Sequence, residues 1–211
     1  HFDIKKEIEV IVNFVDVSRF QRQPINAFKK VIAPNGERIL LHASNFRKIK
    51  RVQDVVNIFA EVNKQIPSKL LFVGDGPERS TAEDLARELG VCDEIQFVGK
   101  QEQMEDIMPI ADLFLLTSEY ESFGLAALEA MAAGVPVVST NAGGLSEIVT
   151  DGDNGYMGDV GDVATMSKHA LAILKDDHTL NEFKKRAAEH AKKFDISKII
   201  PLYEKLYERF L

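Results

Sequence analysis

The 211-residue chain contains no tryptophan and a single cysteine, Cys92. One cysteine cannot form an internal disulfide, and this composition fits a reducing compartment such as the cytoplasm. The sequence also lacks an apolar run long enough to span a bilayer, and its first residues do not resemble a signal peptide. We therefore expect a cytoplasmic protein with no membrane span.

A surplus of positive charge is also missing. The formal net charge is -7 and the pI is about 5.3, which argues against nucleic acid as the main partner because a phosphate backbone requires a basic face. The five histidines are scattered and share no ligand spacing with one another or with Cys92. Residues 151–155 (DGDNG) lack the ligand series of a calcium loop. We expect no metal site.

The chain does contain a regular alternation of strand-like and helix-like segments. Short apolar runs predict six strands, and amphipathic or alanine-rich segments between and after them predict the helices. Such alternation is typical of an α/β, Rossmann-like fold, with a parallel sheet of about six strands and helices on both faces. The predicted strands are residues 39–43, 70–73, 94–99, 113–117, 135–139 and 156–160.

The two ends of the chain stand outside this alternation. Residues 1–23 are predicted to be an interdomain linker or, alternatively, an edge strand of the same sheet formed by residues 8–13. Residues 24–194 hold this alternation and form the predicted Rossmann-like domain. Residues 195–211 are predicted to form a final helix that is kinked by Pro201 or starts after it. Its apolar side chains would pack on an N-terminal domain or mediate self-association as a homodimer.

One helix start stands out as a ligand site. Ser122 is a plausible N-cap, and the amides of Phe123, Gly124 and Leu125 would then be unpaired and available to a phosphate. Glu121 and Glu129 flank this start, separated by a helical rise of about 12 Å. That separation is too long for an acid–base pair on one bond, but it suits a long ligand. The alternative is an ordinary first-turn acid and a surface glutamate.

Two further loops follow strands and converge on the same edge of the predicted sheet. Residues 44–51 carry Arg47 and Lys50, which could bind phosphate oxygens, although most such clusters are simply solvated. Residues 74–77 (GDGP) offer Gly74 and Gly76 for close approach of a ligand. Arg79 stands where the dinucleotide fingerprint requires a third glycine, which disfavours a nicotinamide cofactor. Together the three loops predict a diphosphate-bearing ligand.

These residues carry a resemblance to a known family. Glu121 and Glu129 form the E-x7-E motif of retaining glycosyltransferases with the two-domain GT-B fold, and residues 74–77, 97–99, 129–138 and 143–144 stand in the order that those enzymes show. Residues 13–16 (NFVD) resemble their interdomain segment. The resemblance covers nearly the whole chain, but only the C-terminal, nucleotide-sugar-binding half of such an enzyme.

The resemblance implies a role for each matching position. Glu121 would bind the donor sugar and Lys50 would neutralise the diphosphate leaving group; these are the expected catalytic residues. The amides of residues 123–125 would bind the sugar-side phosphate, and Glu129 would bind the ribose. Gly99 and Lys100 would lie beside the uracil.

One position departs from the family. Many relatives have arginine where Asn45 stands, and Arg47 is the expected substitute.

We expect no metal or other cofactor, and a front-face displacement with retention.

A narrower resemblance concerns the substrates. Residues 44–56, with residues 121–124, are similar to family members that join N-acetylglucosamine to L-malate in bacillithiol biosynthesis. This implies UDP-N-acetylglucosamine as donor and L-malate as acceptor, and a chain that is inactive without the N-terminal domain. The alternatives are a glycosyltransferase for another UDP-sugar and acceptor, and a non-catalytic nucleotide-sugar-binding module.

Overall fold

The computed structural model describes residues 8–22 and 25–210. Residues 1–7 and 23 of the predicted linker, residue 24 at the predicted domain start and residue 211 of the final segment lie outside the described residues. Within the described ranges, no helix is both long enough and apolar enough to cross a membrane.

The centre of the molecule is the predicted six-stranded parallel sheet. Its strands are β1 (Arg38–Ser44), β2 (Ser68–Gly74), β3 (Ile95–Phe97), β4 (Leu113–Leu116), β5 (Val137–Thr140) and β6 (Gly155–Gly158). They lie in the order β3-β2-β1-β4-β5-β6, and every pairing is parallel. The central strands are buried on both faces, as their continuous apolar runs require. The order reverses between β1 and β4, and ligands bind at the carboxyl edge of such a switch point.

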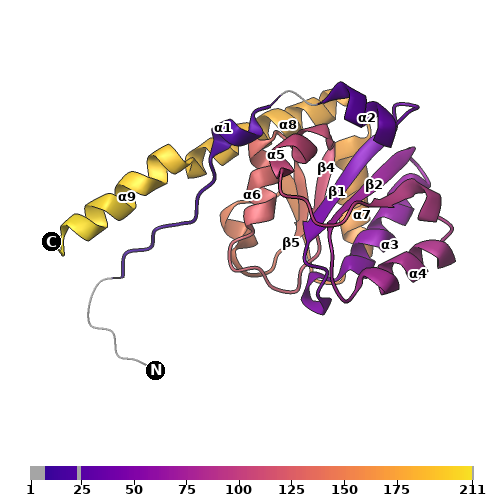
Figure 1. Cartoon of the computed structure of the whole chain (residues 1–211), viewed down its shortest axis with the longest axis horizontal. Coiled ribbons are helices and arrows are strands. Elements are labelled where there is room, and N and C mark those ends of the chain that lie inside the picture. The colour runs from indigo at the N-terminus through magenta and orange to yellow at the C-terminus, as the bar shows by residue number, and fades with distance from the viewer. Residues whose placement is uncertain (1–7, 23–24, 211) are drawn as a thin grey trace.

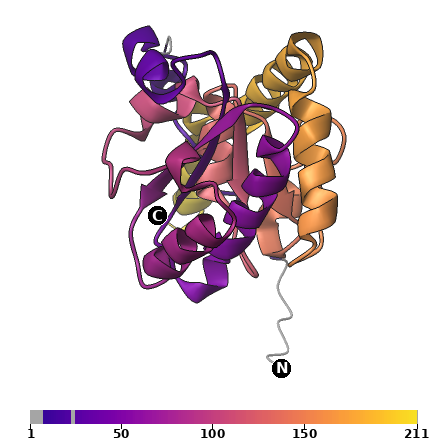
Figure 2. The ribbon, with the colours of Figure 1, turned by 90° about the vertical axis from the view of Figure 1, so that its right-hand side faces the viewer.

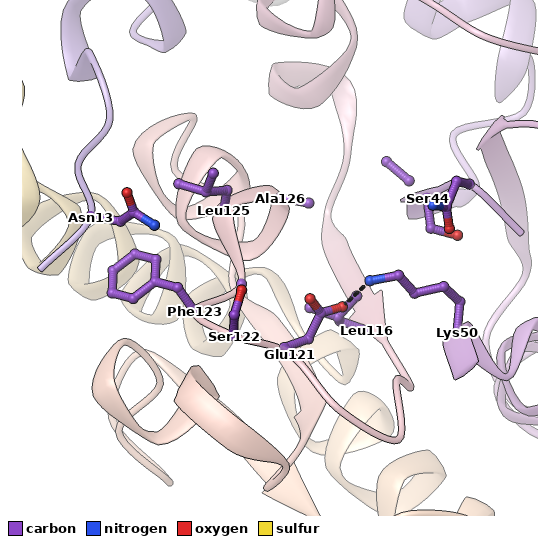
Figure 3. A pocket seen from close by; sticks show the side chains of 12 residues that line it. Asn13, Ser44, Lys50, Leu116, Glu121, Ser122, Phe123, Leu125 and Ala126 are labelled. Atoms are coloured by element: carbon purple, nitrogen blue, oxygen red, sulfur yellow. Dashed lines mark hydrogen bonds and ion pairs between the residues drawn. The ribbon is translucent and has the colours of Figure 1, made fainter. Parts of the chain in front are cut away.

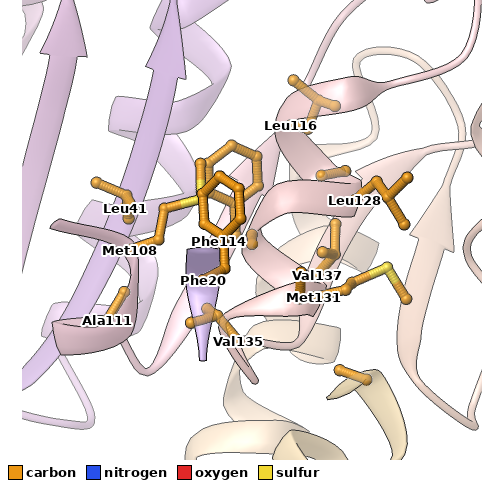
Figure 4. Close-up of a cluster of buried hydrophobic side chains, with 14 of the residues drawn as sticks. Phe20, Leu41, Met108, Ala111, Phe114, Leu116, Leu128, Met131, Val135 and Val137 are labelled. Atoms are coloured by element: carbon orange, nitrogen blue, oxygen red, sulfur yellow. The ribbon is translucent and has the colours of Figure 1, made fainter. Parts of the chain in front are cut away.

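Helices cover both faces of the sheet (Figures 1 and 2). On one face, α3 (Val52–Asn63), α4 (Arg79–Glu88) and α7 (Val163–Leu174) pack over one buried apolar cluster. On the other face, α2 (Asn26–Ile32), α5 (Met104–Ile107) and α6 (Leu125–Ala132) pack over a second cluster, and α8 (Asp177–Ala191) contributes to both. Figure 4 shows part of the second cluster, which includes Phe114 and Leu128. The α/β fold class is confirmed.

The N-terminal segment pairs with the end of the chain and not with the sheet. Val15 donates to Phe194 O (3.0 Å), and Ile196 donates to Val15 O (2.9 Å). A short helix, α1 (Val17–Phe20), follows, and its Phe20 is buried in the cluster of Figure 4. In the described part of the N-terminal segment, residues 8–13 form no strand and the one bridge is at Val15, so the alternative of an edge strand at residues 8–13 is wrong.

Helix α9 (Ile196–Glu208) projects from the body of the molecule beside this N-terminal segment (Figure 1). It begins at Ile196 and continues through Pro201, so the expectation that it might start after the proline is wrong. Ile199 is buried, whereas Leu202 and Phe210 at the end of the chain are exposed.

Candidate functional site

Three adjoining hollows lie at the carboxyl edge of the sheet. We name them by one lining residue each: the Glu121 hollow, the Lys100 hollow and the Glu129 hollow. The first two share Ala43, Ser44 and Asn45; the first and third share Leu125; and the second and third share Met104. The three loops predicted to converge thus border one connected depression.

The start of α6 forms one wall of the Glu121 hollow, but Ser122 is not its N-cap. Gly124 is, with φ +95°, and no side chain caps the helix. A Cβ at Gly124 would lie 2.5 Å from Leu145 Cδ2, so both the backbone conformation and the packing favour glycine. Among the described residues, no protein acceptor pairs with the amides of residues 123–126. The predicted set of free amides is present, although the cap was misassigned.

Lys50 and Glu121 point toward each other across this hollow and form an ion pair (Figure 3). Both side chains are largely buried, with 20% and 14% of their surfaces exposed. Ser118 Oγ also donates to Glu121 Oε1 at 2.7 Å. Because both contacts use Oε1, Glu121 Oε2 remains available to a ligand. The predicted catalytic pair is brought together, with Ser118 as an additional support.

The backbone that carries Lys50 is tied to the end of β4. Thr117 Oγ1 donates to the carbonyl oxygens of Lys50 (3.0 Å) and Arg51 (3.1 Å). Glu119 N donates to Ile49 O at 2.8 Å. These bonds join two loops that are separated by about seventy positions in the chain and fix Lys50 opposite the start of α6.

Two glycines, Gly143 and Gly144, pack against the backbone of the loop that carries Glu121. Gly144 N donates to Glu121 O at 2.8 Å. A Cβ at Gly143 would lie 2.0 Å from that same carbonyl oxygen, and a Cβ at Gly144 would lie 2.4 Å from Ser122 O. This close backbone packing explains the Gly143-Gly144 pair, to which the sequence analysis assigned no role.

His42 lies behind the hollow and is fully buried. Its Nδ1 lies 2.9 Å from Leu115 O, a contact in which the ring must donate, so Nε2 accepts from Ser44 Oγ at 2.8 Å. Burial lowers the pKa of His42 from 6.5 to about 4, and the Lys50 charge acts in the same direction. A neutral imidazole therefore positions Ser44, which lines the hollow and was not among the predicted site residues.

The two glycines of the second loop have different positions. Gly74 lines the Lys100 hollow, whereas Gly76 lines none of the three hollows. A Cβ at Gly74 would lie 1.8 Å from Ser44 O, and one at Gly76 would lie 2.0 Å from Asn45 O. Both glycines thus allow the loops after β1 and β2 to pack together. Gly99 O accepts from Gly74 N at 2.8 Å, beside Lys100.

The structure distinguishes the two candidates for the missing arginine. Asn45 lines both the Glu121 and the Lys100 hollows. Arg47 is exposed and lines none of the three. Among the described residues that line the Glu121 hollow, Lys50 is therefore the only cation.

Glu129 lies in the neighbouring hollow together with Arg19 and Glu105. Burial raises its pKa; the Glu105 charge acts in the same direction, and the Arg19 charge opposes it. The two glutamates of the E-x7-E motif therefore face separate hollows that meet at Leu125. In the described part of the chain, no three His, Cys, Asp or Glu side chains are grouped to hold a metal ion.

The chain belongs to the family of group 1 glycosyl transferases, whose model matches residues 25–193. It is 42% identical over 204 residues to the N-acetyl-alpha-D-glucosaminyl L-malate synthase of Bacillus anthracis, a match that covers 96% of this chain and 54% of that protein. A D-inositol 3-phosphate glycosyltransferase of Corynebacterium kroppenstedtii is 30% identical over 92% of this chain and 46% of its own length. The chain thus spans about half the length of these curated relatives.

Solved structures share the fold. The sucrose-phosphate synthase of Thermosynechococcus elongatus superposes with a TM-score of 0.85 at 26% identity, over 96% of this chain and 52% of that one. Anabaena HepE, solved in complex with UDP, superposes with a TM-score of 0.86 at 24% identity, over 95% of this chain and 57% of that one. The Rossmann-like domain is therefore the half of a GT-B fold that the sequence predicted.

Proposed function

We propose that this chain is the donor-binding half of a retaining, cytoplasmic glycosyltransferase that uses a UDP-sugar. The observation that carries the proposal is the Glu121 hollow, in which free amides at the start of α6 face the same space as the Lys50–Glu121 pair. A helix start with free amides attracts phosphate, and a lysine opposite adds a point charge. A diphosphate would contact both.

The same arrangement suits the chemistry of sugar transfer. As the bond between the sugar C1 and the phosphate oxygen breaks, its electron pair moves onto UDP. The amides of residues 123–125 and the Lys50 ammonium would stabilise that charge without reorganising. Glu121, held by Ser118, would bind the donor sugar through its free oxygen. The acceptor oxygen would bond to C1 on the face that UDP leaves, and its proton would pass to the departing phosphate.

The three hollows provide separate places for the parts of the donor. Glu129 would accept hydrogen bonds from the ribose hydroxyl groups, and Gly99 and Lys100 would lie beside the uracil. The proposed donor is UDP-N-acetylglucosamine and the proposed acceptor is L-malate, in bacillithiol biosynthesis. The support for these substrates is the 42% identity to a protein named for that reaction.

Calorimetry tests the donor class directly. We expect the chain to bind UDP and not NADH, and to bind UDP-N-acetylglucosamine more tightly than UDP-glucose. Binding of NADH in preference to UDP would overturn the proposal. Equal affinity for the two sugars would remove the support for this donor.

Turnover tests the mechanism. We expect this chain alone to transfer no sugar. When it is joined to the N-terminal half of the Bacillus anthracis relative, we expect transfer from UDP-N-acetylglucosamine to L-malate. In that protein Glu121→Gln should lower kcat about 100-fold or more, because a charged group at the reacting sugar is lost. Unchanged kcat would show that Glu121 does not have this role.

A further inference from the structure

The segment predicted as a linker forms a wall of the Glu129 hollow. Phe14, Asp16, Arg19 and Phe20 all line it. The segment is anchored at both ends, since Val17 N donates to Asp195 Oδ2 at 3.2 Å and Phe20 is buried in the apolar cluster. A passive tether would require none of these contacts.

The charges that line this hollow are unbalanced. Within the described residues they comprise one cation and four carboxylates: Arg19 and Asp16 from the N-terminal segment, Glu102 and Glu105 from the region of α5, and Glu129 from α6. Partial burial disfavours an ionised Glu129, and the Glu105 charge acts in the same direction. Arg19 opposes both effects.

Arg19 is directed into this position by a partner on another element. Its Nη2 donates to Glu105 Oε1 at 3.1 Å, and the Glu105 side chain is only 10% exposed. Arg22 lies farther from the same oxygen, at 3.7 Å, forms its short contact with Asp106 at 2.7 Å and does not line the hollow. The two arginines of the segment therefore differ in position, although they share Glu105.

We infer that Arg19 is a positioning residue of the donor site: paired with Glu105, it holds α1 against α5 and places a cation in the hollow that also holds Glu129, the proposed acceptor for the ribose hydroxyl groups. This inference rests on the proposed function. It makes the segment before the domain a part of the nucleoside end of the site, so that a change in that segment alters donor affinity through the charge of Glu129.

The inference predicts a change in pH dependence. An acid that loses a nearby cation holds its proton to a higher pH. Donor affinity in an Arg19→Gln chain should therefore begin to fall at a higher pH than in the wild type. A purely structural role for Arg19 would weaken binding by the same factor at every pH.

Calorimetry with UDP between pH 5.5 and pH 8 tests this on the chain and its variants. We expect Arg19→Gln to weaken UDP binding several-fold at pH 6 and less at pH 8, and Arg19→Lys to keep most of the affinity. Arg22→Gln, the matched control, should behave as the wild type. In a Glu129→Gln background, Arg19→Gln should have little further effect, because the two changes act on one interaction.

The outcomes separate the two proposals. A wild-type chain that does not bind UDP contradicts the proposed function itself. A wild-type chain that binds UDP, with parallel pH profiles for the wild type and Arg19→Gln, overturns the role of Arg19. Additive losses in the double variant overturn it as well. Thermal unfolding shows which variants are folded. If Arg19→Gln does not fold, Glu105→Gln tests the same coupling with the opposite sign: loss of the Glu105 charge should let Glu129 ionise at a lower pH, and an unshifted pH profile would overturn the role of the pair.

Discussion

The two glutamates of the E-x7-E motif have the same chemistry and opposite surroundings. Glu121 is held by direct contacts, from the Lys50 ammonium and the Ser118 hydroxyl group, on one of its oxygens. Glu129 has no protein hydrogen bond described for its carboxylate, and its pKa is raised by burial. One carboxylate is therefore positioned by neighbours, whereas the other is left unpaired at the wall of a hollow.

This difference indicates how a single helix serves two parts of one ligand. A carboxylate beside a reacting centre must be fixed in orientation, and Glu121 is fixed by Lys50 from the loop after β1 and by Ser118 from its own loop. A carboxylate that accepts hydrogen bonds from hydroxyl groups needs free lone pairs, which Glu129 retains. Comparing UDP with uridine, which lacks the phosphates, separates the two sides experimentally.

The largest effect should follow from removing the cation on the Glu121 side. Lys50→Met keeps the apolar stem but loses a charge-assisted contact to phosphate. The Kd for UDP should therefore rise about 10- to 100-fold. Uridine affinity should not change, because the lost contact is to phosphate. Calorimetry with both ligands measures this, and Lys48→Met, an exposed lysine in the same turn, is the control. An equal loss for uridine would contradict the assignment.

The next effect concerns the support beneath Glu121. A Cβ at Gly144 would lie 2.4 Å from Ser122 O and 2.8 Å from Phe123 Cα, so Gly144→Ala must displace the loop backbone. We expect about a 10-fold weaker Kd for UDP and a free energy of unfolding lower by about 1–3 kcal/mol. Uridine binding should be retained. Ser146→Ala, at an exposed position in the same turn, should leave both quantities unchanged, and if Gly144→Ala did so too, the packing argument would fail.

Most of the fold and half of the site were predictable because they depend on local patterns. The apolar runs that became β1, β2 and β4 each end in a loop with distinctive residues, and parallel strands bring such loops to one edge. Lys50, Glu121 and the free amides were therefore expected together, as the structure places them. The resemblance to glycosyltransferases rested on the same local motifs, and the family match bears it out.

The remaining features depend on contacts between distant positions. Gly144 contacts the Glu121 loop, and Arg19 contacts Glu105, although the partners are far apart in the sequence. The spacing of apolar residues carries no information about such contacts. The misassigned cap at Ser122 has a physical reason as well. The left-handed conformation at Gly124 moved the helix start by two residues, and a choice between a serine and a glycine cap depends on the packing of Leu145.

A smaller effect is expected on the Glu129 side. Glu129→Gln should weaken UDP and uridine equally, by about 3- to 10-fold, because it removes the acceptor for ribose hydroxyl groups and leaves the phosphate contacts intact. The raised pKa also predicts that wild-type affinity falls as the pH decreases through that pKa, which lies above the ordinary glutamate value, and that the variant lacks this dependence. Exposed Glu147→Gln is the control. A loss confined to UDP would contradict the assignment of Glu129 to the ribose.

The smallest effect concerns the histidine behind the Glu121 hollow and separates pH effects on folding from those on binding. The pKa of His42 is lowered to about 4, so between that value and 6.5 the unfolded chain binds the proton and the folded chain does not. Stability therefore falls as the pH decreases through 6.5. From pH 7 to pH 6 the contribution of His42 to the free energy of unfolding should decrease by about 0.7 kcal/mol.

Denaturant titrations of the wild type and His42→Asn at both pH values measure this contribution. Asparagine can still donate to Leu115 O, so the variant removes the titrating ring while keeping that bond, and its stability should fall less between pH 7 and pH 6. Equal decreases would show that His42 is protonated in the folded chain. If His42 is neutral in the folded chain, lowering the pH reduces the free energy of unfolding through a residue on the Glu121 side. On the Glu129 side, lowering the pH reduces the ligand affinity. The two carboxylates are therefore distinguished by pH as well as by ligand.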